Sequence, residues 1–191
     1  MPVHKGITRD AIIKAALKIL RKDGYAAVNA RSVAKMLKCS TQPIYAEFKN
    51  MQELKEELHR TAAAIHTQKV MEVMQKGIVG HECRRYHAYG MGFIHFARDE
   101  KELFRYLYLQ ERQHIDDVHL PEIIKIIQEE YGYTEEVAAA FHQDMIYYSY
   151  GIAVLVNTGY CKLTDEEIAE RFHVHFMALT NIYGIPPKYA G

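Results

Sequence analysis

The sequence predicts an all-α fold, and three observations support this prediction. Apolar residues recur three and four positions apart along most of the 191 residues, which is the spacing of one helix face. No stretch alternates apolar and polar residues in the way that indicates a half-buried strand. Cap-forming residues precede the apolar stretches and glycines follow them, as at Thr8 and Gly24 or at Thr134 and Gly159.

The first predicted helix begins after Thr8, whose side chain can cap it, and ends at Gly24. Its apolar residues repeat at helical spacing between Ile12 and Leu20. Asn29 is a good cap for a second, shorter helix. The residues expected to face inward from that second helix are Ala30, Val33, Ala34 and Leu37.

A third short helix is predicted from Ser40, its expected cap, to Phe48. Pro43 lies in its first turn, where proline is tolerated because first-turn amides have no partner within the helix. Ile44 and Phe48 lie four positions apart and are expected to pack against the first two helices. Three short helices within fifty residues, the last two joined by a three-residue turn, match the helix-turn-helix layout.

The remaining sequence predicts further amphipathic helices, and Thr164 with Glu167 forms a capping-box pattern before the last of them. Hydrophobic residues make up 49% of the chain, which is enough for a core without disulfides or metal. We expect two domains, at residues 1–50 and 51–191. The predicted helices of the second are 51–76, 82–99, 101–113, 121–131, 134–158 and 164–183.

Charge is distributed unevenly along the chain although the formal net charge is zero. Residues 1–60 carry 12 Lys and Arg against 6 Asp and Glu, so the basic segment is a plausible footprint for a polyanion. Cys39, Cys83 and Cys161 lie far apart without a Cys-x-x-Cys spacing, which favours free thiols in a reducing compartment. We see neither a signal peptide nor a membrane-length apolar run, and expect a soluble cytoplasmic protein.

The N-terminal stretch resembles the DNA-binding domain of TetR/AcrR-type transcriptional regulators. The shared features include Gly24-Tyr25 after the first helix, Val33-Ala34 in the second, and Ile44-Tyr45 in the third. The resemblance covers the 47 residues TRDAIIKAALKILRKDGYAAVNARSVAKMLKCSTQPIYAEFKNMQEL. Later in the chain, GIAVLVNTGYCKLTDEEIAERF is similar to the last two helices of that family. The resemblance implies a ligand-responsive DNA-binding regulator, commonly a repressor, that binds a double-stranded operator as a homodimer.

In a helix-turn-helix the second helix of the pair enters the major groove with its N-terminal residues at the base edges. Gln42 can pair with adenine, Thr41 can meet a base or a phosphate, and Pro43 can press on a thymine methyl. The resemblance makes Tyr45 a phosphate anchor. Residues near the backbone complete the expected DNA-binding set, which is Arg31, Ser40, Thr41, Gln42, Pro43, Tyr45 and Lys49.

Alternatives remain open at two of these positions, since Tyr45 could be a packed aromatic and Pro43 could serve only to start the helix. The chain also departs from the family pattern twice. Lys38 stands where a turn glycine is common, so a positive φ is expected there. Met51 stands where many members have a lysine, so one phosphate contact is absent or comes from Lys49 or Lys55.

The family resemblance implies that the last two helices of two copies form a four-helix bundle. The residues we expect at this dimer interface are Phe141, Tyr148, Ile152, Leu155, Ile168, Phe172, Phe176 and Leu179. The same half is rich in aromatic residues and is expected to hold an effector pocket, although aromatic stripes at helical spacing are more often ordinary core. Gly90 and Gly92 leave room for a ligand or a crossing helix. The candidate pocket residues are Tyr86, Phe93, Tyr108, His114 and Tyr148.

Two Glu-x-x-His pairs, Glu111 with His114 and Glu170 with His173, have the spacing used by di-iron helical bundles. About one such pair is expected by chance from this composition, and no nucleophile elbow, phosphate loop or zinc spacing occurs. We therefore expect no cofactor, no metal and no catalysis. An all-helical enzyme or protein-interaction module remains the alternative to a regulator, and Cys39 is expected to be a small turn residue rather than a redox sensor.

Overall fold

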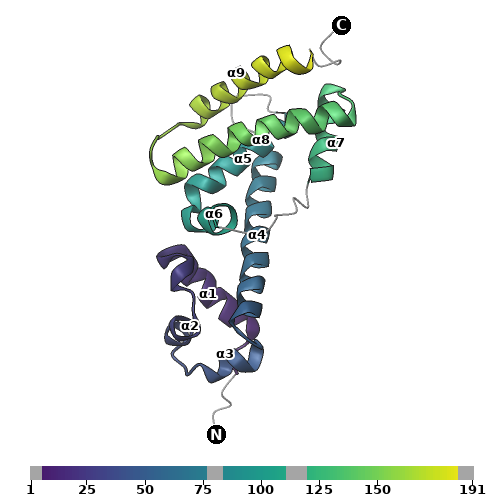
Figure 1. Cartoon of the computed structure of the whole chain (residues 1–191). Helices are drawn as coiled ribbons and strands as arrows, with labels where there is room; N and C mark the ends of the chain where they lie inside the picture. The colour runs from purple at the N-terminus through teal and green to yellow at the C-terminus, as the bar shows by residue number, and fades with distance from the viewer. Residues whose placement is uncertain (1–5, 77–83, 111–119, 185–191) are drawn as a thin grey trace. The chain divides into compact units, whose positions relative to one another are not determined.

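The computed structural model describes residues 6–76, 84–110 and 120–184, and within these ranges it contains helices and no strand (Figure 1). The prediction of an all-α fold is confirmed. None of the described helices is long and apolar enough to cross a membrane. In chain order the elements are α1 (Arg9–Asp23), the 3₁₀ turn η1 (Tyr25–Ala27), α2 (Ala30–Leu37), α3 (Gln42–Glu47), α4 (Met51–Lys76), α5 (Arg85–Asp99), α6 (Lys101–Tyr108), α7 (Leu120–Tyr131), α8 (Glu135–Thr158) and α9 (Asp165–Tyr183).

The chain divides into two compact units. The first comprises residues 1–67 and 100–111, and thus contains α1, α2, α3, the beginning of α4, and α6. The second comprises residues 68–99 and 112–191, with the end of α4, α5, α7, α8 and α9. A helix that follows α5 in the sequence is therefore part of the same unit as the N-terminal helices.

The first unit is built around the apolar faces of three short helices and the start of α4. Thr8 accepts a hydrogen bond from the Ala11 amide, and Asn29 forms a capping box with Ser32, so both predicted caps are confirmed. The buried side chains come from every one of these helices and include Ile12, Ala16, Leu20, Val33, Ile44, Phe48, Leu54 and Leu58. This core fixes the directions of α2 and α3.

Helix α6 and its cap residue Glu100 are joined to α1, η1 and α4 by polar and aromatic contacts within the first unit. The Arg21 guanidinium donates two hydrogen bonds of 2.9 Å to the Glu100 carboxylate. The ring centroids of Tyr25 and Tyr106 lie 4.8 Å apart, and the Tyr106 hydroxyl donates to the Lys55 carbonyl. These contacts explain why residues 100–111 belong with the N-terminal helices.

The second unit has α5 and α8 packed together, with α7 and α9 against them. A Cβ atom added at Gly92 would lie 2.9 Å from the Val70 Cα, so this glycine lets α5 approach α4. A Cβ atom at Gly90 would lie 3.1 Å from the Phe172 ring of α9. Both glycines therefore make room for a neighbouring element. An aromatic cluster fills the region between α5, α7, α8 and α9 and consists of Tyr86, Tyr131, Tyr133, Phe141, Phe176 and Tyr183.

Three predicted helix ends differ from the observed ones. Ser40 does not cap α3, because the chain at Thr41 already has helical dihedral angles and takes the cap position without a side-chain hydrogen bond. Helix α6 ends at Tyr108 instead of continuing through Gln110, and residues 111–113 lie outside the described part. Helix α5 is described from Arg85, where the Glu130 carboxylate of α7 accepts the Arg85 amide at 2.8 Å.

Candidate nucleic-acid interface

The turn between α2 and α3 depends on one residue with an unusual backbone conformation. Lys38 has φ 56° and ψ 42°, and is the single non-glycine residue with positive φ among those described. This conformation lets the Cys39 amide donate to the Ala34 carbonyl at 3.0 Å and so closes the end of α2. The sequence prediction of a positive φ at Lys38 is confirmed, and its cost is about 1 kcal/mol.

Helix α3 has one buried and one exposed face. Ile44 and Phe48 are 0% and 1% exposed, so they attach the helix to the core as the sequence predicts. Gln42 and Tyr45 are exposed on the opposite side, and 51% of the Tyr45 surface is accessible. Thr41 and Pro43 are half-buried at the start of the helix. This face has the polar and aromatic groups that can meet base edges and phosphates.

The other expected DNA-binding residues lie at the surface of the same unit. Arg31 is exposed in the first turn of α2, which Asn29 caps, and Ser40 is exposed in the turn. Lys49 is exposed just after α3, and its backbone amide donates to the Glu53 carboxylate at 2.8 Å. This hydrogen bond is the largest cause of a lowered pKa at Glu53, followed by the hydrogen bond from Arg9. The Lys49 side chain stays on the exposed surface.

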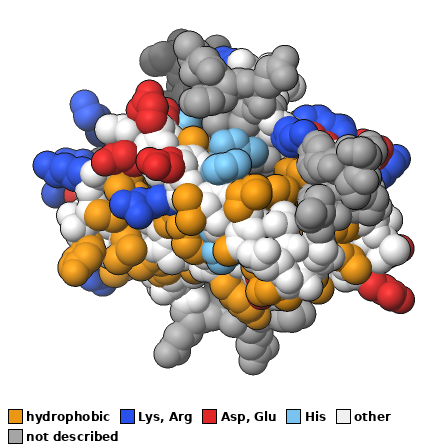
Figure 2. Space-filling view, turned by 90° about the horizontal axis from the view of Figure 1, so that it is seen from above, with side chains coloured by type: hydrophobic (Ala, Val, Ile, Leu, Met, Phe, Trp, Pro, Cys, Tyr) orange, Lys and Arg blue, Asp and Glu red, His pale blue; other side chains and the backbone are white. Residues whose placement is uncertain are grey.

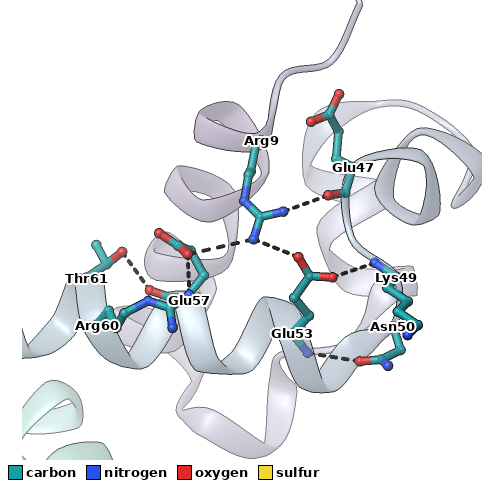
Figure 3. A network of polar contacts seen from close by, with 8 residues as sticks. All are labelled: Arg9, Glu47, Lys49, Asn50, Glu53, Glu57, Arg60 and Thr61. Atoms are coloured by element: carbon teal, nitrogen blue, oxygen red, sulfur yellow. Dashed lines mark hydrogen bonds and ion pairs between the residues drawn. The ribbon is translucent and has the colours of Figure 1, made fainter.

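The structure adds a residue that the sequence analysis did not single out. Arg9, in the first turn of α1, contacts both the end of α3 and the beginning of α4 (Figure 3). The sequence around Arg9 does not predict these contacts, because Glu47 lies 38 residues away along the chain. Glu53 and Glu57, four positions apart on α4, form the complementary acidic pair that completes the contact.

Comparison with known proteins identifies the family of this region. A family model described as bacterial regulatory proteins, tetR family, matches residues 12–58. These 47 residues are therefore a TetR-family N-terminal domain. The match spans most of α1, then α2, α3 and the first turns of α4, which are the elements that hold the exposed face of α3. Members of the TetR family are DNA-binding transcription regulators that respond to ligands.

Solved structures share this fold beyond the TetR-family N-terminal domain. A protein with unknown function from Rhodococcus sp. RHA1 matches with a TM-score of 0.71 and 19% identity, covering 93% of this chain and 98% of that one. The Streptomyces coelicolor TetR family protein ActR, in complex with (S)-DNPA, matches with a TM-score of 0.55 and 16% identity, covering 93% and 97% of the two chains. Apo ActR matches with a TM-score of 0.51 and 16% identity, covering 94% and 97%. No curated protein matches the chain.

The residues expected in an effector pocket have separate environments. Tyr86 is buried, its hydroxyl lies 2.9 Å from His142 Nδ1, and burial raises its pKa well above the usual value. Phe93 lies against Tyr150. Tyr148 stacks on the His175 ring of α9, with 4.0 Å between centroids. All of these belong to the second unit.

The other two candidate pocket residues are not placed with them. Tyr108 is in the first unit, where its hydroxyl lies 3.1 Å from His66 Nδ1. His114 lies outside the described residues, as does Glu111 of the first Glu-x-x-His pair. Glu170 and His173 of the second pair are exposed on α9. Among the described side chains, no group of three or more His, Cys, Asp or Glu could hold a metal ion.

The residues expected at a dimer interface are mostly interior residues of the second unit. Phe141, Ile152, Ile168, Phe172 and Leu179 are buried within the protomer. Tyr148 and Phe176 are half-buried, whereas Leu155 is 41% exposed. Figure 2 shows that hydrophobic side chains also lie on the surface. The exposed large apolar residues of α8 and α9 are Tyr147, Leu155, Val174, Met177 and Ile182.

Proposed function

We propose that this protein is a TetR-family transcription regulator that binds a pseudo-palindromic operator as a homodimer and is released by a small-molecule effector. One observation carries the proposal. Helix α3 is fixed to the core by Ile44 and Phe48 while Gln42 and Tyr45 face solvent. A helix held in this way can enter the major groove without unfolding any part of the first unit.

The proposed DNA contacts follow from the chemistry of the exposed groups. Gln42 pairs with an adenine edge, Thr41 meets a base or a phosphate, and Pro43 lies against a thymine methyl. The Tyr45 hydroxyl donates to a phosphate oxygen. Backbone contacts from both sides of α3 complete the set, which adds Arg31, Ser40 and Lys49. In this proposal residues 1–50 contact DNA, and residues 51–191 bind the effector and the second copy.

The proposed homodimer uses the outer faces of α8 and α9. Tyr147 and Leu155 of α8, and Val174, Met177 and Ile182 of α9, are large apolar residues with exposed fractions between 41% and 71%. Gly151 lies between the two α8 residues, and beyond its chain neighbours and its own helix backbone no heavy atom would lie within 4 Å of a Cβ added there, so another helix can approach closely. Packing this face against its copy would remove the apolar surface from water.

This proposed interface differs in its residues from the set expected from the sequence and the family resemblance. Leu155 is common to both, while Phe141, Ile152, Ile168, Phe172 and Leu179 support the interface from inside the protomer. Two copies joined in this way form a four-helix bundle and present two α3 helices. The expected operator therefore has two related half-sites separated by about one helical turn.

The proposed effector is a small molecule bound within the helical second half, near Tyr86, Phe93 and Tyr148. The support is an aromatic interior with hydrogen-bonding groups, together with a similar fold in ActR, whose structure was solved with (S)-DNPA. Effector binding would favour the dimer arrangement in which the α3 helices no longer match the operator. Repression relieved by an effector, in the cytoplasm, is the mode we propose.

A selection experiment tests the function directly. The full-length protein is incubated with a library of random duplexes, and the bound DNA is recovered and sequenced through several rounds. We expect a two-half-site sequence, and a mobility shift with that duplex at concentrations where a scrambled duplex of equal length stays free. An enzyme or an interaction module with a helix-turn-helix shape would select no sequence, and that result would reject the proposal.

A further inference from the structure

Helix α3 is too short to hold its own position. It has six residues, and Thr41 at its cap makes no side-chain hydrogen bond. Isolated helices shorter than about 12 residues are marginal in water, so α3 depends on contacts with the rest of the first unit. Ile44 and Phe48 hold its middle and its end in the core. Hydrogen bonds at the end of α3 would restrict its angle to α4 further, because they weaken steeply when misaligned.

Arg9 supplies directional contacts at the end of α3. Its Nη1 donates a 2.8 Å hydrogen bond to the carbonyl of Glu47, the last residue of the helix. That carbonyl is one of the C-terminal groups that have no partner within a helix. The Arg9 guanidinium also lies over the Phe48 ring, 4.0 Å from its centroid, which is a cation–π distance.

The same guanidinium contacts the beginning of α4. Its Nη2 lies 2.9 Å from Glu53 Oε1 and 3.7 Å from Glu57 Oε2. The second oxygen of Glu53 accepts the Lys49 amide at 2.8 Å, and the Glu53 amide donates to Asn50 Oδ1 at 2.9 Å. Arg9 is therefore connected to both sides of the bend between α3 and α4 (Figure 3).

Arginine suits this position because its planar guanidinium offers five donors in a fixed arrangement. A lysine ammonium at the same place could pair with Glu53, but it lacks the fixed fork whose two nitrogens reach the Glu47 carbonyl and the Glu53 carboxylate. The described contacts direct the guanidinium towards protein acceptors and an aromatic ring. These contacts suit a side chain that orients α3 relative to α4.

We propose that Arg9 is a positioning residue, which sets the angle of α3 against α4 and thereby the fit of Gln42 and Tyr45 to the operator. This inference rests on the proposed DNA-binding function. It predicts that losing Arg9 weakens the recognition of a specific sequence far more than the attraction to DNA in general.

The test compares full-length wild type with Arg9→Gln on two fluorescent duplexes of equal length. One carries the sequence that the wild type selects from a random library, and the other is scrambled. We expect Arg9→Gln to bind the selected duplex about tenfold more weakly, as for loss of a charge-assisted hydrogen bond, while its affinity for the scrambled duplex changes by less than about twofold. The dependence of log affinity on log salt should keep the wild-type slope.

A matched control separates position from charge. Lys14→Gln removes one positive charge from the same helix, at a side chain that is 70% exposed and pairs with Asp10. We expect this variant to keep the wild-type ratio of the two affinities. Arg9→Lys keeps the charge, but we still expect a smaller ratio of the affinity for the selected duplex to the affinity for the scrambled duplex. It is also the variant to use if melting curves show that Arg9→Gln is not folded at the assay temperature.

Several outcomes would overturn the role of Arg9. If both duplexes lose affinity equally and the salt slope falls by about 0.9, Arg9 contacts a phosphate instead. Equal binding of the selected duplex by wild type and both Arg9 variants would also reject the proposal. A wild-type protein that selects no sequence overturns the proposed function and this role together, so the two failures can be told apart.

Discussion

The hydroxyl of Tyr45 is the single group on α3 with which phosphate anchoring can be tested most cleanly. Tyr45 is 51% exposed, so its ring contributes little to the core, and Tyr45→Phe should leave the melting temperature unchanged. If the hydroxyl binds a phosphate, the variant should lose affinity for every duplex. The slope of log affinity against log salt should stay close to that of wild type, because a neutral hydroxyl releases no counterion. Fluorescence anisotropy over a salt series measures both.

Tyr160→Phe is the matched control, since Tyr160 is also exposed but lies after the end of α8. It should bind all duplexes like wild type. Unchanged affinity of Tyr45→Phe for both selected and scrambled DNA would contradict the phosphate contact and leave Tyr45 as a surface aromatic.

Lys38 allows a prediction about stability at the same scale. Its φ of 56° strains any residue with a Cβ, and glycine adopts it freely. We expect Lys38→Gly to raise the free energy of unfolding by roughly 0.5 to 1 kcal/mol, after the greater chain entropy of unfolded glycine is subtracted. Lys35→Gly, three residues earlier inside α2, should lower it by about 1 kcal/mol. Urea denaturation compares the two variants, and equal destabilisation by both would contradict strain at Lys38.

Helix boundaries could be predicted from sequence wherever the cap is local. Thr8, Asn29 and Thr164 each accept backbone hydrogen bonds from the next turn, so nearby residues determine these ends. The start of α5 depends instead on Glu130, which is 45 residues away from Arg85 in sequence. Arg9 is likewise 38 residues from Glu47. Such contacts arise from tertiary packing, and periodicity does not reveal them.

The attachment of α9 to α5 gives a prediction at the scale of elements. Asp165, in the first turn of α9, accepts a 2.7 Å hydrogen bond from Arg98 and lies 3.0 Å from His95 Nε2. Partial burial raises the pKa of the Asp165 carboxyl, but the hydrogen bond from Arg98 and the nearby His95 outweigh it, so the pKa is lowered overall. The ionised form is therefore favoured in the folded state.

A lowered pKa in the folded state fixes the sign of the pH dependence. The stabilisation is present above the pKa of unfolded aspartate, and it is lost as the pH falls through the lower folded value. We expect Asp165→Asn to lower the free energy of unfolding at pH 7. The gap in this free energy between the variant and wild type should narrow as the pH falls below about 4. Glu170→Gln is the control, because Glu170 is an exposed carboxylate further along α9. Urea denaturation from pH 3 to 7 measures this gap. A gap between wild type and Asp165→Asn that stays constant over this range would contradict a stabilising role of the ionised Asp165.

At the scale of the whole molecule, the sequence predicted the all-α fold and the exposed face of α3 because both follow from local periodicity. The apolar residues that stay exposed on α8 and α9 were harder to predict. Phe141, Phe172 and Leu179 have the right helical spacing, but they are used inside the protomer. Periodicity shows that a helix has apolar residues on more than one side. Only the packed structure shows that Tyr147, Val174 and Ile182 are the ones left at the surface.

Assembly and operator binding should therefore fail together when this outer face is made charged. Val174 is 62% exposed, so Val174→Glu should change the stability of an isolated protomer by no more than about 0.5 kcal/mol. Between two copies, however, it would bury two carboxylates near each other, which is strongly unfavourable.

Leu120→Glu is the matched control, because Leu120 is an exposed apolar residue on α7. Sedimentation at micromolar concentration should show monomers for Val174→Glu and dimers for Leu120→Glu. The monomer should bind a two-half-site duplex hardly better than a single half-site, since it offers one α3 helix. A Val174→Glu protein that stays dimeric would place the interface on another surface.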